Sequence, residues 1–250
     1  MLEKKNSKYW VYSKYAIFSM LFNTNRIIYD ILIDSKFEKY YRDIFRIKGV
    51  NINKFKVKIV SKSYIEKKIG KLAKYQGIAT LVEPLKYINF DNTNLQKINK
   101  SFLLIVDTMN DPSNFGSLIR TCYAFSVSHI IVLERNMPTE NSFILSAASG
   151  AFDNIKIYKA GNIINVINLL KKNNWWVIGL ESKNLSACID IKECEFKDQK
   201  KAVIVGSEHV GLRRLVRENC DCLVRIEMKE KNLNSLNMVN AATIALYELS

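Results

Sequence analysis

The chain has 250 residues, of which 48% are apolar, and it carries a formal net charge of +14. This length allows one large domain or two small ones, with a core that buries about 70% of the unfolded surface. No run approaches the ~20 apolar residues of a membrane span, which argues against a membrane protein.

The positive charge lies almost wholly in the first 97 residues. They hold 20 Lys and Arg against 8 Asp and Glu, a net charge of +12, whereas residues 98–250 hold 18 against 16. A basic segment beside a near-neutral one is typical of a module that binds a phosphate backbone. Compositional drift in a chain rich in Lys, Asn and Ile is the alternative, but it does not explain why only one segment is unbalanced.

The cysteines indicate a reducing compartment. There are five, an odd number, and no two of them form a C-x-x-C pair. Cys220 and Cys222 are too close together for a common zinc knuckle and lack nearby partners, so we expect no metal. Reduced thiols are typical of the cytosol, and a soluble cytoplasmic protein is therefore expected.

The first half of the chain predicts a small α/β domain. We expect a helix over 9–22, strands over 26–33 and 56–60, a helix over 63–72 and a strand over 77–82. Together they would form a basic domain over residues 1–85. Residues 86–100 lack clear periodicity, and we interpret them as a linker.

The second half, residues 101–250, has a different pattern of apolar residues. Short apolar runs at 102–106, 130–133, 175–178 and 202–205 alternate with helical stretches near 114–125, 140–150 and 162–172. This alternation predicts a parallel sheet covered by helices on both faces. In such sheets a ligand usually lies at the carboxyl ends of the strands.

A first polar cluster follows the run at 102–106. Asp111 and Pro112 break the chain, and a helix can start at Pro112 or Ser113. Asn114 then lies in its first turn and Arg120 six residues further on. Two interpretations stay open: an anion site formed by backbone amides and Arg120, or a capping amide and a solvated arginine.

A second cluster follows the run at 202–205. Gly206 and Gly211 permit a tight bend and a close backbone approach to a ligand, with Glu208 between them. The pattern is neither a phosphate-binding Walker loop nor a dinucleotide fingerprint, because the residues and the glycine spacing differ. Glu208 could orient a ligand or be an exposed loop acid.

A third cluster opens the last helix. Asn234 or Ser235 can cap this helix, and an apolar stripe includes Leu236 and Val239. Capping explains one polar residue but not Asn234, Ser235, Asn237 and Asn240 together. A functional surface and a plain helix start are both compatible with this cluster.

Taken together, the order and spacing of the three clusters resemble the SpoU/TrmH family of RNA 2′-O-methyltransferases, in the SPOUT superfamily. The resemblance covers about 102–249. It implies a catalytic set at Asn114, Arg120, Glu208, Ser235 and Asn237. It also implies that Gly206, Ile226 and Leu236 bind S-adenosylmethionine, largely through their backbone.

The resemblance has further implications for fold and partners. It implies a C-terminal SPOUT-type parallel-sheet domain with a deep trefoil knot, a small N-terminal α/β substrate-binding domain, and a homodimer. Tyr75-Gln76-Gly77-Ile78 is similar to a His-Gln-Gly-Ile stretch of some members, closest to bacterial 23S ribosomal RNA guanosine 2′-O-methyltransferases. RNA, with ribosomal RNA favoured, is therefore the expected partner.

The sequence also departs from the family pattern. Glu227 stands where a proline is usual before the third cluster, and Ser126 stands where a glycine is common. If Glu227 points inward, it would disturb the cofactor site. His129 begins an apolar strand and is expected to be structural, and no G-x-S-x-G serine elbow supports a hydrolase.

Three alternatives to a ribosomal RNA methyltransferase remain open. The substrate could be transfer RNA. The chain could be a non-catalytic RNA-binding assembly factor on the same fold. It could also be a small-molecule α/β enzyme, although the basic first half counts against that.

Overall fold

The structure is a computed structural model in which the chain divides into two compact units. It describes residues 8–71, 73, 75–90, 95, 98, 102–109, 111–182, 188–194, 199–207, 211–230 and 235–250. The small-sheet unit comprises the chain up to Lys86 together with Thr139–Asn154. The large-sheet unit comprises Tyr87–Pro138 and Ile155–Ser250.

The small-sheet unit is built on four strands in the order β1-β4-β2-β3. The β2–β3 pair is parallel, and β4 is antiparallel to both β1 and β2. Its strands are β1 (Tyr9–Val11), β2 (Ile28–Asp34), β3 (Val57–Val60) and β4 (Ile78–Val82). Its helices are α1 (Lys14–Phe22), α2 (Glu38–Ile47), α3 (Lys62–Ile69) and α5 (Ser142–Ala148).

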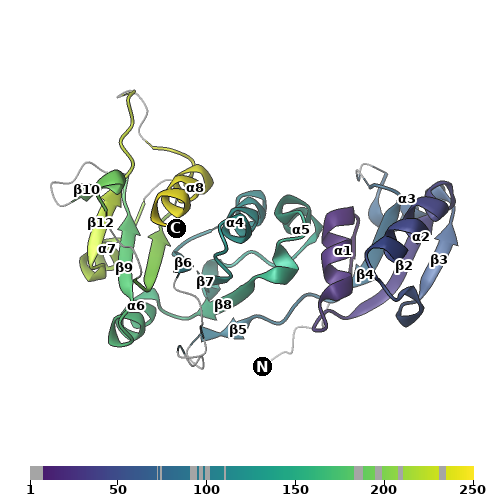
Figure 1. Ribbon diagram of the computed structural model, residues 1–250, viewed down its shortest axis with the longest axis horizontal. Helices are drawn as coiled ribbons and strands as arrows, with labels where there is room; N and C mark the ends of the chain where they lie inside the picture. Colours follow the sequence, from purple (N-terminus) through teal and green to yellow (C-terminus); the bar gives the residue numbers. More distant parts are fainter. Residues whose placement is uncertain are drawn as a thin grey trace. The chain divides into compact units, whose positions relative to one another are not determined.

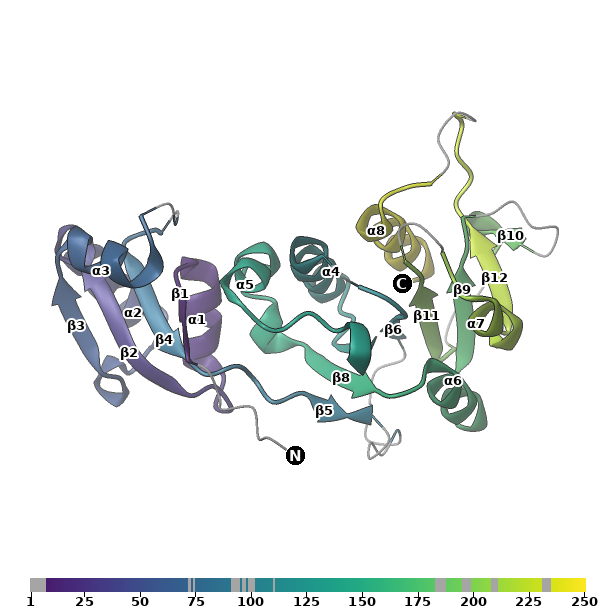
Figure 2. The same cartoon turned by 180° about the vertical axis from the view of Figure 1, so that it is seen from behind.

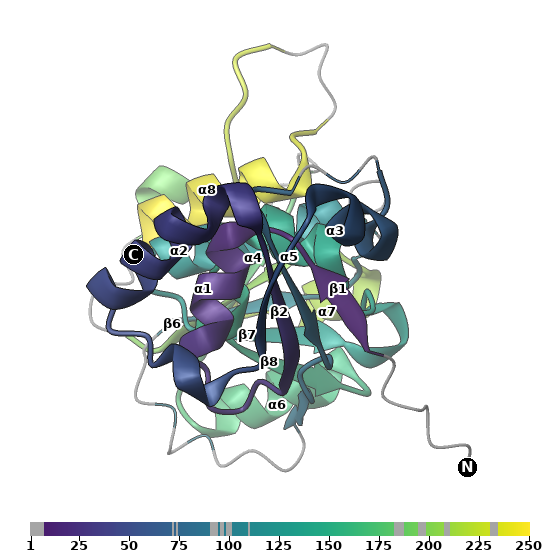
Figure 3. The same ribbon diagram turned by 90° about the vertical axis from the view of Figure 1, so that its right-hand side faces the viewer.

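Aromatic and aliphatic side chains fill both sides of this small sheet. The rings of Phe18, Tyr41 and Phe45 join α1 to α2. On the other side, Ile65 of α3 packs with Leu32 and Ala79. Figure 3 shows α1 and α2 together on one side of β2, with α3 on the other.

The predictions for the first half are largely confirmed for the strands and only partly for the helices. The three expected strands are present as β2, β3 and β4. The helix predicted over 9–22 is wrong at its start, because Tyr9–Val11 pairs with β4 and α1 begins only at Lys14. Helix α2 was not predicted.

The large-sheet unit contains eight strands, all paired in parallel, in the order β10-β12-β9-β11-β6-β7-β8-β5. The strands are β5 (Ile88–Asn89), β6 (Phe102–Val106), β7 (His129–Leu133), β8 (Lys156–Ala160), β9 (Trp176–Leu180), β10 (Cys188–Asp190), β11 (Lys201–Val205) and β12 (Cys222–Arg225). Its helices are α4 (Pro112–Ala124), α6 (Ile163–Lys172), α7 (Arg214–Asn219) and α8 (Met238–Leu249).

Helices cover both faces of this sheet, as predicted. Ile167 of α6 and Val216 of α7 pack into a core with alternate strand residues such as Leu103 and Ile105. Helices α4 and α8 pack against each other, and Figures 1 and 2 show them on the opposite side of the sheet from α6. The predicted α/β parallel-sheet class is therefore confirmed.

Residues 86–100, which we expected to be a linker, contribute to the large-sheet unit. Ile88 and Asn89 form β5 and pair in parallel with β8. Phe90, Leu95 and Ile98 are buried in the core beneath α6.

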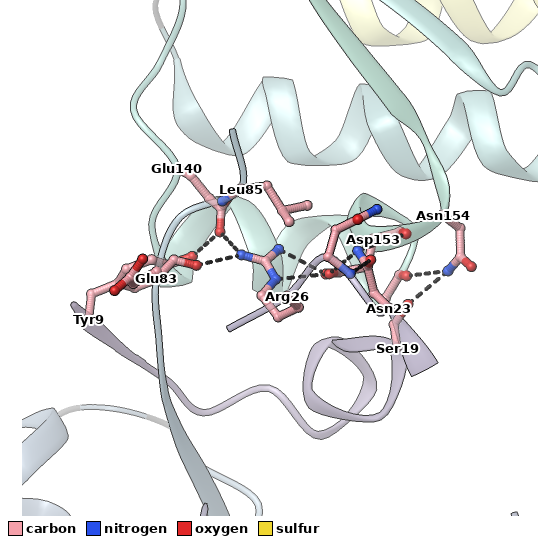
Figure 4. Close-up of polar contacts among 11 residues, drawn as sticks. Tyr9, Ser19, Asn23, Arg26, Glu83, Leu85, Glu140, Asp153 and Asn154 are labelled. Atoms are coloured by element: carbon pink, nitrogen blue, oxygen red, sulfur yellow. Dashed lines mark hydrogen bonds and ion pairs between the residues drawn. The ribbon is translucent and has the colours of Figure 1, made fainter. Parts of the chain in front are cut away.

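The segment Thr139–Asn154 packs with the small-sheet unit through a buried charge network around Arg26 (Figure 4). The Arg26 Nη1 atom lies 2.5 Å from Oε1 of Glu140, and its Nε lies 2.9 Å from Oδ1 of Asp153. The backbone carbonyl of Glu83 accepts a further hydrogen bond from Arg26. Burial lowers the pKa of Arg26, but the charges of Glu140 and Asp153 outweigh it, so its pKa lies above the usual value.

Hydrogen bonds from neighbouring groups satisfy the two carboxylates of this network. The Tyr9 hydroxyl and the Leu85 backbone N–H donate to Glu140, and the Asn23 amide donates to Asp153. A buried ion pair contributes to stability only when such bonds satisfy its remaining atoms. Arg26 and Glu140 are more than 100 residues apart in the sequence. The network therefore holds the segment Thr139–Asn154 against the first strands and the first helix of the chain.

No described helix has both the length and the apolar character that a bilayer crossing requires.

Candidate functional site

The ends of three neighbouring parallel strands form a hollow in the large-sheet unit. Strands β12, β9 and β11 lie side by side in the sheet, and the residues at or just after their carboxyl ends line the hollow. Leu236, just before α8, and Met238 and Ala241 in its first turn close the hollow. Its volume is about 590 Å³ with the open mouth included.

A tight turn between Gly206 and Gly211 forms one wall of the hollow. Ser207 and Gly211 exchange two backbone hydrogen bonds, with N···O distances of 3.1 and 2.9 Å. A Cβ atom on residue 206 would lie 2.2 Å from the carbonyl carbon of Gly211, so no other residue fits there without moving the backbone. Gly211 itself has φ of +70°, which favours glycine. Glu208 and His209 lie outside the described residues.

An ion pair with one buried partner links the chain just after this turn to the end of the neighbouring strand. Strands β6 and β11 are paired in register so that Val106 lies beside Val205. Asp107, next along the chain, is buried and receives two hydrogen bonds from Arg213, at 2.8 Å to Oδ2 and 2.5 Å to Oδ1. Hydrogen bonding to Asp107 raises the pKa of Arg213 above its usual value. The ion pair thus links the residue that follows the second cluster closely, Arg213, to Asp107, which lies a few residues before the first cluster.

A second carboxylate, that of Glu181, lies in the wall of the hollow itself. Glu181 directly follows β9, is buried, and its Oε1 accepts a hydrogen bond from the Ser182 backbone N–H at 2.9 Å. Arg217 of α7 lies 3.3 Å from its other oxygen. The sequence analysis missed this residue, although an acid directly after a buried strand could have identified it.

The third cluster enters the hollow through Ser235 and Leu236, which line it. Asn237 is the cap of α8, and its side-chain oxygen accepts a hydrogen bond from the Val239 N–H at 2.8 Å. The prediction that Ser235 or Asn234 caps this helix is wrong for Ser235, because the helix begins later, and Asn234 lies outside the described residues. Ser235 is therefore available to face the hollow.

The first cluster forms the start of α4, as predicted. Asp111 caps the helix by accepting from the Ser113 N–H at 2.8 Å, and Pro112 is its first residue. Asn114 is half-buried in the first turn and Arg120 is exposed two turns on. Neither lines the hollow, and within the described part of the chain Arg120 forms no salt bridge.

The structure thus gathers half of the eight predicted site residues at one place. Four line the hollow, namely Gly206, Ile226, Ser235 and Leu236. Asn237 caps the helix that closes the hollow, while Asn114 and Arg120 belong to α4, which packs against that helix. The position of Glu208 is outside the described residues.

Residues 101–247 match the model of the SpoU rRNA Methylase family. The chain belongs to this family. A Staphylococcus aureus protein named as a TrmH family tRNA/rRNA methyltransferase is 34% identical over 197 residues, which are 77% of each chain.

Solved SpoU structures share the fold of this chain. The SpoU methyltransferase AviRb from Streptomyces viridochromogenes, in complex with the cofactor AdoMet, is 20% identical and superimposes with a TM-score of 0.75, covering 97% of this chain and 89% of that one. A structure described as an RNA 2′-O ribose methyltransferase is 18% identical, with a TM-score of 0.73 over 99% and 91% of the two chains. At such identities these likenesses show the fold alone.

Two departures from the SpoU pattern can now be placed in the structure. Glu227 is exposed, whereas its neighbours Ile226 and Met228 line the hollow. The substitution of the usual proline therefore puts no charge into the hollow. Ser126 has φ of +58°, a conformation that explains why glycine is common at this position of SpoU proteins.

The remaining candidates for chemistry have structural roles. His129 is buried, bonds the Ser128 hydroxyl at 2.8 Å and stacks on the ring of Tyr158, as a structural histidine should. Burial raises the pKa of the Cys220 and Cys222 thiols to about 12, so neither is a thiolate at neutral pH. The described residues contain no cluster of three or more metal-ligating side chains.

Proposed function

We propose that this SpoU-family chain is an S-adenosylmethionine-dependent methyltransferase that methylates a ribose 2′-hydroxyl in RNA. The observation that carries the proposal is the hollow at the ends of β9, β11 and β12. Ser235, Leu236, Gly206 and Ile226, which the family resemblance assigned to the site, all line it. These residues are far apart in the chain, and packing of the apolar core does not require them to line one hollow.

The hollow suits S-adenosylmethionine in shape and chemistry. Its side chains are mainly aliphatic, including Leu180, Val205, Ile226 and Leu236, and would pack on the faces of a purine. Gly206 and Gly211 line the hollow and carry no side chain, so their backbone groups can approach a ligand closely. When bound, the cofactor supplies a methyl group on a sulfonium. The buried carboxylate of Glu181 provides negative charge in the same wall.

Arg120 is the residue best suited to hold the RNA at the site. Its guanidinium is exposed on α4 and carries no salt bridge within the described residues, so its charge is available to a phosphate. A guanidinium with pKa above about 12 is a poor base at neutral pH. We therefore assign Arg120 to binding the adjacent phosphate and to stabilising negative charge that develops on the ribose oxygen.

Asn114, Ser235 and Asn237 complete the proposed site together with Glu208. Asn237 orders the first turn of α8 through its cap, which positions Ser235 and Leu236 next to it. We propose a homodimer as the working form, in line with the family resemblance. The deep trefoil knot also stays a prediction.

Ribosomal RNA is the proposed substrate class, with a guanosine of 23S ribosomal RNA favoured, and the cytoplasm is the proposed location. The excess of 20 basic over 8 acidic residues in the first 97 supports a large polyanion over a small molecule. Transfer RNA is the second candidate, favoured by the name of the S. aureus relative. A non-catalytic scaffold loses one of its supports, because Glu227 is exposed and does not line the hollow.

The proposal is tested by transfer of labelled methyl from S-adenosylmethionine to unmodified ribosomal RNA and, separately, to transfer RNA. The expected result is label in ribosomal RNA, with the modified linkage resistant to alkali because the 2′-oxygen is blocked. Label in transfer RNA alone would show that transfer RNA, the second candidate, is the substrate. Label in an alkali-sensitive position would contradict ribose methylation.

A further inference from the structure

A second hollow lies in the small-sheet unit, and no residue of the proposed methyl-transfer site lines it. It is lined by Lys14 at the start of α1, by Phe37, Tyr40 and Tyr41 around the start of α2, and by Gln76 before β4. Three aromatic residues, one glutamine and one lysine therefore line the same space. None of these residues belongs to the motifs that define the SpoU methyltransferase domain.

The floor of this second hollow is held rigidly. The buried Tyr41 donates its hydroxyl hydrogen to the backbone carbonyl of Gln76, and the backbone N–H of Lys14 donates to the Gln76 side chain at 3.3 Å. The ring of Phe37 lies against Gly77, where a Cβ atom would be 2.5 Å from the ring. Gly77 also has φ of +82°. The rings are thus positioned before any ligand binds.

Two of the three rings remain open to solvent. Phe37 is 42% exposed and Tyr40 is 47% exposed, although both are large apolar side chains. Tyr40 stays exposed although Tyr41 and Phe45 of the same helix are buried in the core. Exposed rings that line a hollow are suited to stack on the flat face of a ligand.

Lysine residues are next to these aromatic residues in the sequence. Lys36 and Lys39 are exposed and flank Phe37 and Tyr40, and in the described part of the chain neither forms a salt bridge. Lys14 lines the hollow itself. The ammonium of Lys14 lies 5.0 Å from the centre of the Tyr15 ring, which does not line the hollow. The combination of stacking rings, an amide for hydrogen bonding and nearby lysines matches an unpaired base with its phosphate.

We propose that this second hollow binds one unpaired nucleobase of the RNA substrate, stacked on Tyr40 and Phe37, with Lys14 near the adjoining phosphate. The inference rests on the proposed function, because it assumes that RNA is the substrate. It adds that the small-sheet unit recognises a loop or bulge rather than a continuous duplex. Gln76 provides the amide that can bond the edge of the base.

The test uses the full-length chain with two probes: a stem-loop RNA carrying 2-aminopurine in its unpaired loop, and a blunt duplex of the same stem. Tyr40→Ala is expected to weaken stem-loop binding about 5- to 100-fold, the range found for loss of one stacked base. Duplex binding should stay within about twofold, because no phosphate contact is removed. Tyr40→Trp should retain both affinities.

Tyr64→Ala is the matched control. Tyr64 belongs to the same unit, is 41% exposed and lies beneath the ammonium of Lys68, but does not line the second hollow. Its loss should leave stem-loop binding unchanged. If Tyr40→Ala does not fold, Tyr40→Leu keeps apolar contact with Tyr41, whose ring centroid is 5.1 Å away, and should show the same loss.

The outcomes separate this proposal from the proposed function. If the unsubstituted protein binds RNA and transfers methyl groups while Tyr40→Ala behaves like Tyr64→Ala, the base site alone is wrong and the hollow serves another occupant, such as a protein side chain. If the unsubstituted protein binds neither probe at low salt, the RNA substrate and the base site are both wrong.

Discussion

The two units of the chain present their candidate sites in opposite ways. In the large-sheet unit the hollow is formed by strand ends, a glycine turn and aliphatic side chains, with charges paired around it as in Asp107–Arg213. In the small-sheet unit the hollow is formed by exposed rings next to unpaired lysines. The first arrangement suits a compact ligand bound by backbone and shape, and the second suits a polyanion with flat bases.

The units also differ in how their interiors are held together. The large-sheet unit has a continuous apolar core, whereas the small-sheet unit secures Thr139–Asn154 through the buried charges of Arg26, Glu140 and Asp153. Arg26→Ala should therefore cost about 3–5 kcal/mol of unfolding free energy, because two buried carboxylates lose their counter-charge. Urea unfolding followed by circular dichroism would measure it.

The control for this change is Arg42→Ala. Arg42 forms an exposed i,i+4 pair with Glu38 in the same unit, and its loss should cost only about 0.3–0.5 kcal/mol. Equal losses for the two variants would show that the Arg26 network does not stabilise the unit.

The next largest effect is expected at Arg120, which we assign to the RNA phosphate beside the reacting ribose. Arg120→Ala should lower methyl transfer about 100- to 1000-fold, as for loss of a group that stabilises transition-state charge. Its affinity for S-adenosylmethionine should not change, because Arg120 does not line the hollow. Arg214→Ala, which removes another exposed helix arginine of the same unit, is the control and should keep normal turnover. Near-normal turnover of Arg120→Ala would remove Arg120 from the site.

A smaller effect tests the strained turn after α4. Ser126→Gly should raise the unfolding free energy by about 0.5–1 kcal/mol, because a left-handed conformation costs more for serine than for glycine. Thermal unfolding at one fixed pH would detect the change. Destabilisation would mean that Ser126 makes a contact that outweighs its backbone strain.

The smallest effect is expected at Glu227. Because this side chain is exposed while Ile226 and Met228 line the hollow, Glu227→Gln should leave S-adenosylmethionine affinity within about twofold. Isothermal titration calorimetry would measure it. A tenfold gain in affinity would show that the charge of Glu227 acts on the cofactor. It would also reduce the difference between the first hollow, where charges are paired, and the basic surface of the small-sheet unit.

Sequence patterns predicted the elements whose residues are apolar throughout and are also buried in the structure. The apolar runs at β6, β7, β9 and β11 are buried on both faces, so their continuity was a reliable signal. Strand β8 was missed because lysines interrupt its apolar residues. Helix α2 was missed because only Tyr41 and Phe45 of its ten residues are buried.

Long-range contacts account for the other omissions. Nothing near Glu140 or Asp153 in the sequence indicates that Thr139–Asn154 packs with the small-sheet unit, since the partner is Arg26. The cap of α8 was misplaced by two residues because several adjacent side chains can cap a helix, and only the backbone path selects Asn237. The family resemblance identified the hollow better, because four of the residues that it implied line the hollow, namely Ser235, Leu236, Gly206 and Ile226.

The most direct test of the account is calorimetric titration of S-adenosylmethionine into the intact chain and into Gly206→Ala, with Gly161→Ala as control. A Cβ on residue 206 would meet the Gly211 backbone at 2.2 Å, whereas one on residue 161 meets nothing within 4 Å. We predict binding by the intact chain and by Gly161→Ala, and at least about a 100-fold loss for Gly206→Ala as the turn is displaced. Absence of binding by the intact chain, or equal binding by all three proteins, would contradict a cofactor site in this hollow.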